Sequence, residues 1–292
     1  MNKTYLSLAL VMATLSGSLA AQTLVTVNGT KIDSSEIDLQ VKNLQTQSNG
    51  QVQDNPQLRQ SLLQGTVTRT LVAQEARRLK LDQSAEFKQV SDQALAQAKK
   101  EGADKAKSFK HDWAVYQNEL LLQAFLANVA AQNPVTEADT QKAYNEISSY
   151  YKGSDEVQLG EIITRTTADA DKAIADLKAK KSFKTVAAQY SLAPQAKENG
   201  GIATDYVPLK DLQQNAPAIY NAVSSLKKGQ YTAQPVQGEN GVAAVFYIND
   251  KRAIKIPSYQ EMAPGLTRDM QAARVDAAIQ PLYQKAKIEP SN

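Results

Sequence analysis

The sequence predicts a mostly helical α+β protein, in which an α+β domain is inserted into a helical module built from both ends of the chain. The first observation is the helical spacing of apolar residues over residues 57–150 and again from residue 259 onward. These segments are rich in Ala, Gln, Leu and Lys, which favour helix. The second observation is that residues 157–248 begin and end with strand-like alternation and are helical in between, which is typical of an α+β domain.

The first 21 residues predict a cleavable signal peptide. Lys3 gives a short positive region, residues 5–15 are apolar, and small residues follow before the mature chain. Cleavage after Ala20 and cleavage after Ala21 fit equally well. The apolar run is shorter than the ~20 residues that cross a bilayer. We therefore expect export to the periplasm without a stable membrane anchor.

Composition excludes several classes of function. The chain has 33 basic and 30 acidic residues, a net charge of +3, which is too small an excess to indicate nucleic acid binding. It contains no cysteine, so disulfides, thiol catalysis and thiolate metal sites are excluded, and this absence fits an oxidising compartment. Its single histidine, His111, excludes a multi-histidine metal site. We expect no metal and no other cofactor.

The helical module is predicted from two stretches, residues 22–150 and 256–288. Asn28-Gly29 within residues 24–32 predicts a small hairpin with a tight turn. Amphipathic helices follow up to Asn133-Pro134, with a shorter one over 137–149. A last helix from Tyr259 to about Lys287 is expected to pack on this module.

The inserted domain is predicted over residues 155–254. A strand over 157–163 precedes two helices over 168–181 and 183–190. After the Gly200-Gly201 turn, residues 209–226 are helical with a break at Pro217. Strands over 231–236 and 242–248 complete the domain.

Residues 156–253 resemble a parvulin domain. The matching motifs, in order, are Phe183-x-x-Val-Ala-Ala-x-Tyr190-Ser191, then Gly200-Gly201, Leu226-Lys-Lys-Gly229-Gln, Pro235-Val236 and Asn240-Gly241. The flanking helices, with Val27-Asn-Gly-x-x-Ile32 just after a signal peptide, are similar to SurA-like and PrsA-like foldases. The resemblance implies a chaperone module that binds unfolded or proline-containing client polypeptides, and a PpiC-type peptidyl-prolyl isomerase (rotamase) domain. It leaves the oligomeric state open.

The residues expected at the catalytic centre depart from the family. Parvulins place two histidines and a Cys or Asp there, and the resemblance puts these positions at Glu161, Ala193 and Ala243. Glu161 is the remaining catalytic candidate. It shares strand parity with Leu159, so it either faces an apolar pocket or lies solvated at the sheet edge. We expect weak isomerase activity. The alternative is a catalytically inactive holdase or a partner-specific scaffold.

The pocket for the proline ring is also assigned from the resemblance. Leu212 takes the place of the family's Met and Ile219 that of its Phe. The place of the family's Leu falls on Ile202 or Thr204, depending on a one-residue gap. Ser191 and Tyr206 complete the predicted substrate-binding residues.

Overall fold

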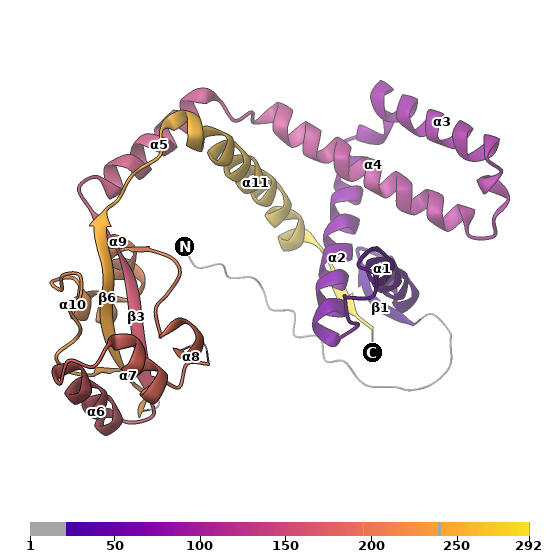
Figure 1. The fold of residues 1–292 in the computed structure, drawn as a ribbon. Coiled ribbons are helices and arrows are strands. Elements are labelled where there is room, and N and C mark those ends of the chain that lie inside the picture. The colour runs from indigo at the N-terminus through magenta and orange to yellow at the C-terminus, as the bar shows by residue number, and fades with distance from the viewer. Residues whose placement is uncertain (1–21, 195, 239–240, 292) are drawn as a thin grey trace. The chain divides into compact units, whose positions relative to one another are not determined.

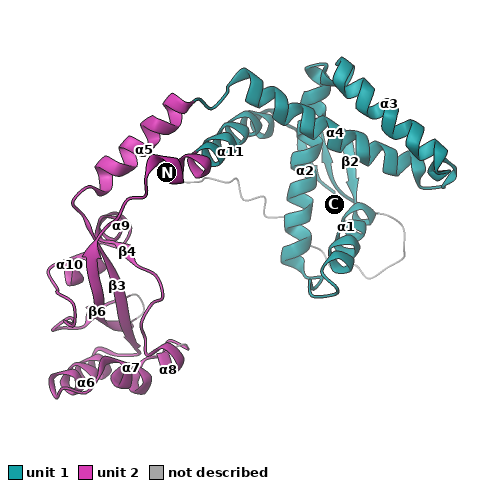
Figure 2. Ribbon diagram, turned by 45° about the horizontal axis from the view of Figure 1, so that its top comes forward, with its two compact units in different colours: residues 1–136, 267–292 teal, residues 137–266 magenta. Residues whose placement is uncertain are grey.

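The computed structural model describes residues 22–194, 196–238 and 241–291, so the predicted signal peptide lies outside the described residues. The chain divides into two compact units. Unit 1 comprises residues 1–136 and 267–292, and unit 2 comprises residues 137–266 (Figure 2). Unit 1 is mainly helical, and unit 2 contains the larger of the two sheets. The predicted mostly helical α+β fold is confirmed.

Unit 1 begins with the predicted hairpin. Strands β1 (Thr23–Val27) and β2 (Thr30–Asp33) pair antiparallel, and Asn28 and Gly29 between them both have positive φ, 47° and 86°. Such a turn favours asparagine and glycine because other residues are strained there. Strand β7 (Ile288–Pro290) pairs with the other side of β1, which gives the order β2-β1-β7.

Five long helices belong wholly or mostly to unit 1 (Figure 1). They are α1 (Ser34–Gln47), α2 (Pro56–Arg78), α3 (Ala85–Lys100), α4 (Phe109–Gln132) and most of α11 (Tyr259–Lys285). Short 3-10 turns, η1 (Leu81–Gln83) and η2 (Ala103–Lys105), flank α3. The side chains of Asn55 and Ser84 cap α2 and α3 by accepting hydrogen bonds from Leu58 N and Phe87 N.

Two buried clusters hold unit 1 together. One joins the hairpin to α1 and α2, with Val27, Ile32 and Ile37 each no more than 1% exposed. The other joins α2 to α4 through Val72 and Phe125. Leu282 of α11 packs against both clusters, so the returning C-terminal helix bridges the two parts of this core.

Unit 2 contains a four-stranded antiparallel sheet of order β4-β3-β6-β5. Its elements in chain order are α5 (Glu137–Tyr151), β3 (Asp155–Thr164), α6 (Thr167–Lys178), α7 (Phe183–Tyr190), α8 (Ala196–Asn199), β4 (Val207–Pro208), α9 (Leu209–Asn215), α10 (Pro217–Val223), β5 (Val236–Gln237) and β6 (Ala243–Ala253). The helical stretch breaks at Pro217 as predicted. The strand predicted over 231–236 is shorter: before β5 only Tyr231 forms a bridge, with Tyr247.

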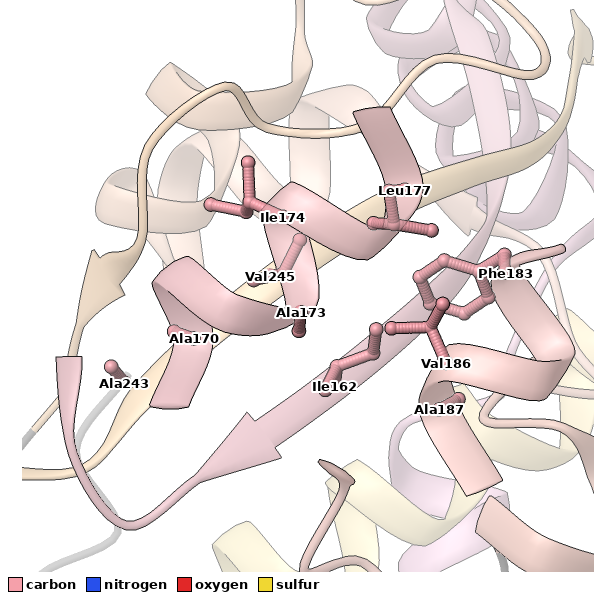
Figure 3. Close-up of a cluster of buried hydrophobic side chains, with 10 residues drawn as sticks. All are labelled: Ile162, Ala170, Ala173, Ile174, Leu177, Phe183, Val186, Ala187, Ala243 and Val245. Carbon is pink, nitrogen blue, oxygen red and sulfur yellow. The ribbon is translucent and has the colours of Figure 1, made fainter. Parts of the chain in front are cut away.

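Helices cover both faces of this sheet. On the α6–α7 face, a cluster around Ile162, Val186 and Val245 is fully buried, and Figure 3 shows Ile162 pointing toward Val186 and Phe183. On the α9–α10 face, Val157, Leu212 and Phe246 form the other cluster. Because successive side chains of a strand alternate between faces, each residue of β3 and β6 belongs to one face or the other.

Helix α5 and the first turns of α11 belong to unit 2, whereas the sequence prediction placed residues 137–150 and 256–266 in the helical module. Tyr151 of α5 donates a hydrogen bond of 2.7 Å to Asp211 of α9. Near the other end of α5, the hydroxyls of Thr140 and Tyr259 are 2.8 Å apart, and the Tyr144 and Tyr259 rings meet edge to face. These contacts join both segments to the sheet-containing unit.

Candidate functional site

Glu161 lies near the middle of unit 2's sheet, on strand β3. It is paired with Phe246 of β6, and its amide donates a 2.7 Å hydrogen bond to the carbonyl of Gly201. Its parity with Leu159 places it on the α9–α10 face. The side chain is exposed, and among the described residues its carboxylate has no hydrogen-bond or ion-pair partner. Glu161 is thus on the apolar face that the sequence predicted, but in contact with solvent.

Ser191 links the loop after α7 to strand β3 through hydrogen bonds. Its hydroxyl oxygen accepts hydrogen bonds from the amides of Ile163 (3.2 Å) and Ala193 (3.3 Å). In addition, Leu192 donates its amide to the carbonyl of Ile163 at 2.7 Å. The motif therefore holds Ala193 beside the strand that carries Glu161. The methyl side chain of Ala193 cannot donate or accept a hydrogen bond, unlike the Cys or Asp that the family places there.

Ala243 does not face Glu161. It pairs with Thr164 and is fully buried in the cluster on the α6–α7 face (Figure 3). The β6 residues on the face of Glu161 include Ala244, paired with Ile163, Phe246, and Ile248, paired with Leu159. Residues paired across an antiparallel ladder share a face, so the structure separates Glu161 from Ala243 by the thickness of the sheet. None of these three β6 residues is a histidine, so they bring no imidazole to the face of Glu161.

The structure brings together two of the three predicted pocket residues. Leu212 is 8% exposed and packs with Ile219 in the cluster on the α9–α10 face. Ile202 forms a bridge with Gly160 and packs on the opposite, α6–α7 face. Thr204, the alternative, is exposed. Ala203, between them, is also exposed, and its amide donates to the carbonyl of Leu159 at 2.8 Å.

Tyr206 belongs to a charged cluster that the sequence did not predict. Its hydroxyl donates a 2.5 Å hydrogen bond to Asp250, and the Arg252 guanidinium lies 3.6 Å from the centre of its ring. Lys228 also pairs with Asp250, at 2.9 Å. The Tyr206 hydroxyl and the Lys228 ammonium lower the pKa of Asp250 to about 2. Because its hydroxyl and one ring face are occupied, Tyr206 acts in this structure as a structural link of the sheet.

Two glycines set the distance between the Gly-Gly loop and β3. A Cβ atom at Gly160 would lie 2.6 Å from the ring of Phe183, which stacks on Tyr247 with centroids 4.5 Å apart. Gly201 has a φ of 73°, and a Cβ there would lie 2.7 Å from the carbonyl oxygen of Glu161. The Gly200-Gly201 motif therefore marks a close backbone approach beside Glu161.

Around Glu161 the α9–α10 face is apolar, and the carboxylate itself is exposed to solvent. Rotation about an X-Pro bond crosses a barrier of roughly 18–20 kcal/mol and breaks no covalent bond. A site lowers that barrier by binding the twisted amide more tightly than the planar one. The α9–α10 face offers apolar groups and one carboxylate for this purpose.

Two family models match the chain. A PPIC-type PPIase domain matches residues 135–264, which include all of the sheet of unit 2. A SurA-like N-terminal domain matches residues 5–119.

Relatives match this chain over most of their own length. A probable parvulin-type peptidyl-prolyl cis-trans isomerase of Bordetella bronchiseptica is 26% identical over 275 residues, which cover 92% of this chain and 93% of the relative. Foldase protein PrsA of Clostridium botulinum is 21% identical, over 89% of this chain and 84% of the relative. A crystal structure of the peptidylprolyl isomerase PrsA from Bacillus cereus is 19% identical over 90% of this chain and 89% of that one, with a TM-score of 0.38.

The fold and the two family models together define a protein in which a helical SurA-like domain accompanies a parvulin domain. The chain therefore carries a parvulin-type PPIase domain together with a SurA-like N-terminal domain, and its relatives bear the names of a probable parvulin-type isomerase and of the foldase PrsA.

Proposed function

We propose that the chain is an exported, periplasmic foldase that binds unfolded client polypeptides and has weak peptidyl-prolyl isomerase activity. The observation that carries this proposal is the composition of the α9–α10 face. Leu212 and Phe246 are buried in the apolar cluster of this face, Ile219 packs against that cluster, and Glu161 is exposed beside Phe246. No imidazole lies on the part of the face that the structure describes. Such a face can hold a proline-containing segment but has little polarity with which to favour its twisted form.

The expected loss of activity can be set on a rough scale. Removing one preorganised hydrogen-bond donor from an active site typically lowers turnover by about a hundredfold or more. The side chains around Glu161 include those of Ala193, Ala244 and Phe246, which cannot form hydrogen bonds. Among these residues, only the Glu161 carboxyl can hydrogen-bond to the amide nitrogen or carbonyl of a bound X-Pro peptide. We therefore propose Glu161 as the residue that supports the remaining activity.

Client binding is proposed for the helical module, residues 22–150 with 256–288. Apolar side chains are exposed on its helices, including Leu39, Val90, Val115 and Tyr116. In α4, the rings of Phe109, Trp113 and Tyr116 stack in series with centroids 6.0 and 5.3 Å apart. Exposed apolar surface of this kind commonly marks a contact site for another polypeptide.

Periplasmic location is proposed from the predicted signal peptide and the absence of cysteine. The described helices include none that is long and apolar enough to cross a membrane.

Two assays on the full-length mature chain test the proposal. In the first, a denatured client is diluted into buffer with and without the protein, and light scattering is followed; we expect reduced aggregation. In the second, refolding of a protein limited by proline isomerisation is followed; we expect slight acceleration at high protein concentration. Rapid turnover would contradict the argument from the missing imidazoles.

The alternative is a catalytically inactive holdase. It is favoured by Ala193 and Ala243, which stand where the family has a Cys or Asp and a histidine. It predicts the first result without the second. If neither aggregation nor refolding changes, a scaffold for one specific partner replaces both proposals.

A further inference from the structure

Unit 1 contains a cavity of about 290 Å³ that is walled by three separate segments. Ile32 and Glu36 come from the junction of β2 and α1, and Thr70 comes from α2. His111 and Val115 come from α4. We name it the Glu36 cavity. All of its walls belong to one compact unit, and it lies outside the parvulin domain.

Glu36 is the unusual group in this cavity. Its side chain is half-buried in the first turn of α1, and among the described residues its carboxylate has no hydrogen-bond or ion-pair partner. Burial raises its pKa, against the opposing charges of His111 and Arg69. An unpaired carboxylate that is partly removed from water costs free energy, which a bound cation would recover.

The neighbouring charges leave room for such a cation. Arg69 directs a guanidinium nitrogen to Gln40 and Thr66, at 2.9 and 3.0 Å. Asp33, a second carboxylate in the lining, accepts a hydrogen bond from Thr23. Lys31 also lines the cavity, but it is exposed, so its ammonium can turn to solvent. An anion would have to lie beside two carboxylates, so the lining favours a cation.

The exposed lining residues, Ala114 and Val115, form the mouth of the cavity and indicate which kind of cation would fit. Val115 is 47% exposed, and Ala114 beside it is exposed too. This apolar wall next to a carboxylate matches a side chain with an aliphatic stem and a charged end. The volume is slightly below the ~300–1,000 Å³ of cavities that take whole small ligands, which suits one long side chain.

We infer that the Glu36 cavity binds the side chain of an arginine or lysine residue of an extended client polypeptide. Arginine fits better because its planar guanidinium can pair with a carboxylate through two hydrogen bonds. The inference rests on the proposed client binding and deepens it: the helical module selects apolar segments that contain a basic residue.

Calorimetric titration of the full-length mature protein with two peptides tests the inference. In the first peptide one arginine is flanked by leucine and alanine. In the second, citrulline of nearly the same shape replaces the arginine, which removes the charge and exchanges one terminal nitrogen donor for a carbonyl oxygen. We expect the arginine peptide to bind about tenfold more tightly, which corresponds to ~1.4 kcal/mol. Glu36→Gln should abolish this preference. Glu119→Gln, the same change at an exposed position of α4 outside the cavity, should preserve it.

A second variant guards against a folding effect of the Glu36 substitution. Val115→Lys places a positive charge at the mouth and should weaken binding of the arginine peptide. Gln123→Lys adds the same charge at another exposed position of α4 and serves as its control.

Equal affinities for the two peptides, an absence of binding, or an unchanged preference in Glu36→Gln would overturn the inference. Suppression of client aggregation is a separate readout. If it persists while the peptide preference is missing, the cavity assignment fails and the proposed client binding stands.

Discussion

The two faces of the unit 2 sheet use the same strands for different purposes. On the α6–α7 face, Ile162, Ala243 and Val245 are fully buried under helices. On the α9–α10 face, Phe246 and Leu212 are 5% and 8% exposed, and Glu161 beside them is open to solvent. Both faces therefore contain a buried apolar core, but the α9–α10 face also carries an exposed carboxylate, at which we propose that a client segment makes contact. Four predictions test this difference, from the largest expected effect to the smallest.

Histidine substitutions at two adjacent residues should separate the faces most strongly. Ala243→His would force an imidazole into a fully packed cluster and should lower the free energy of unfolding by ~3 kcal/mol or more. Ala244 is half-buried on the α9–α10 face, so Ala244→His should lower the free energy of unfolding by well under half as much. Urea unfolding followed by circular dichroism measures both. Equal losses would mean that the two faces are packed alike.

Glycine substitutions should show that the Gly200-Gly201 loop is held close to the backbone of Glu161. Gly201→Ala meets the Glu161 carbonyl at 2.7 Å in addition to the strain of a positive φ, so we expect a loss of ~2–4 kcal/mol. Gly229→Ala has a similar φ, 84°, with open space around the added atom. This control should lose only ~1–2 kcal/mol. A Gly201 variant as stable as the Gly229 variant would disprove the close approach.

The Tyr206–Asp250–Lys228 cluster should make stability depend on acid pH. The folded protein lowers the pKa of Asp250 from 3.8 to about 2, so its contribution is fully present above about pH 4 and is lost as the pH falls toward 2. Asp250→Asn should therefore be less stable than the unchanged protein at neutral pH, and the difference should shrink between pH 4 and pH 2. Asp205→Asn, at a nearby exposed residue, is the control. A difference that is constant with pH would contradict the assignment.

The smallest effect is expected at Glu161 itself. Because its side chain is exposed and unpaired among the described residues, Glu161→Ala should leave the unfolding free energy within ~0.5 kcal/mol of the original. The acceleration of proline-limited refolding by the Glu161→Ala variant should be severalfold smaller than that by the unchanged protein. The double variant Glu161→His with Ala244→His places two imidazoles on one face and should instead raise it. Unchanged refolding in both variants would favour the inactive holdase.

Local patterns predicted much of the fold. The Asn28-Gly29 hairpin and the break at Pro217 follow from turn chemistry, and both occur in the structure. The strand predicted over 231–236 was too long, because its pairing depends on distant residues of β6, such as Tyr247. The grouping of α5 with the sheet depends in the same way on distant partners, here Asp211 and Tyr259.

The sequence by itself determined the inventory of the chain: a single histidine outside the resemblance to parvulins, no cysteine, and the positions of the long helices. The short elements α8, β4 and β7 were not predicted. Only the tertiary structure decided which side chains share a face. Counting residues from Gly241 could not show that Ala243 and Glu161 lie on different faces of the sheet, because the register between β3 and β6 is set by pairs far apart in the sequence, such as Thr164 and Ala243. A shift of one residue in that register moves every side chain to the other face of the sheet.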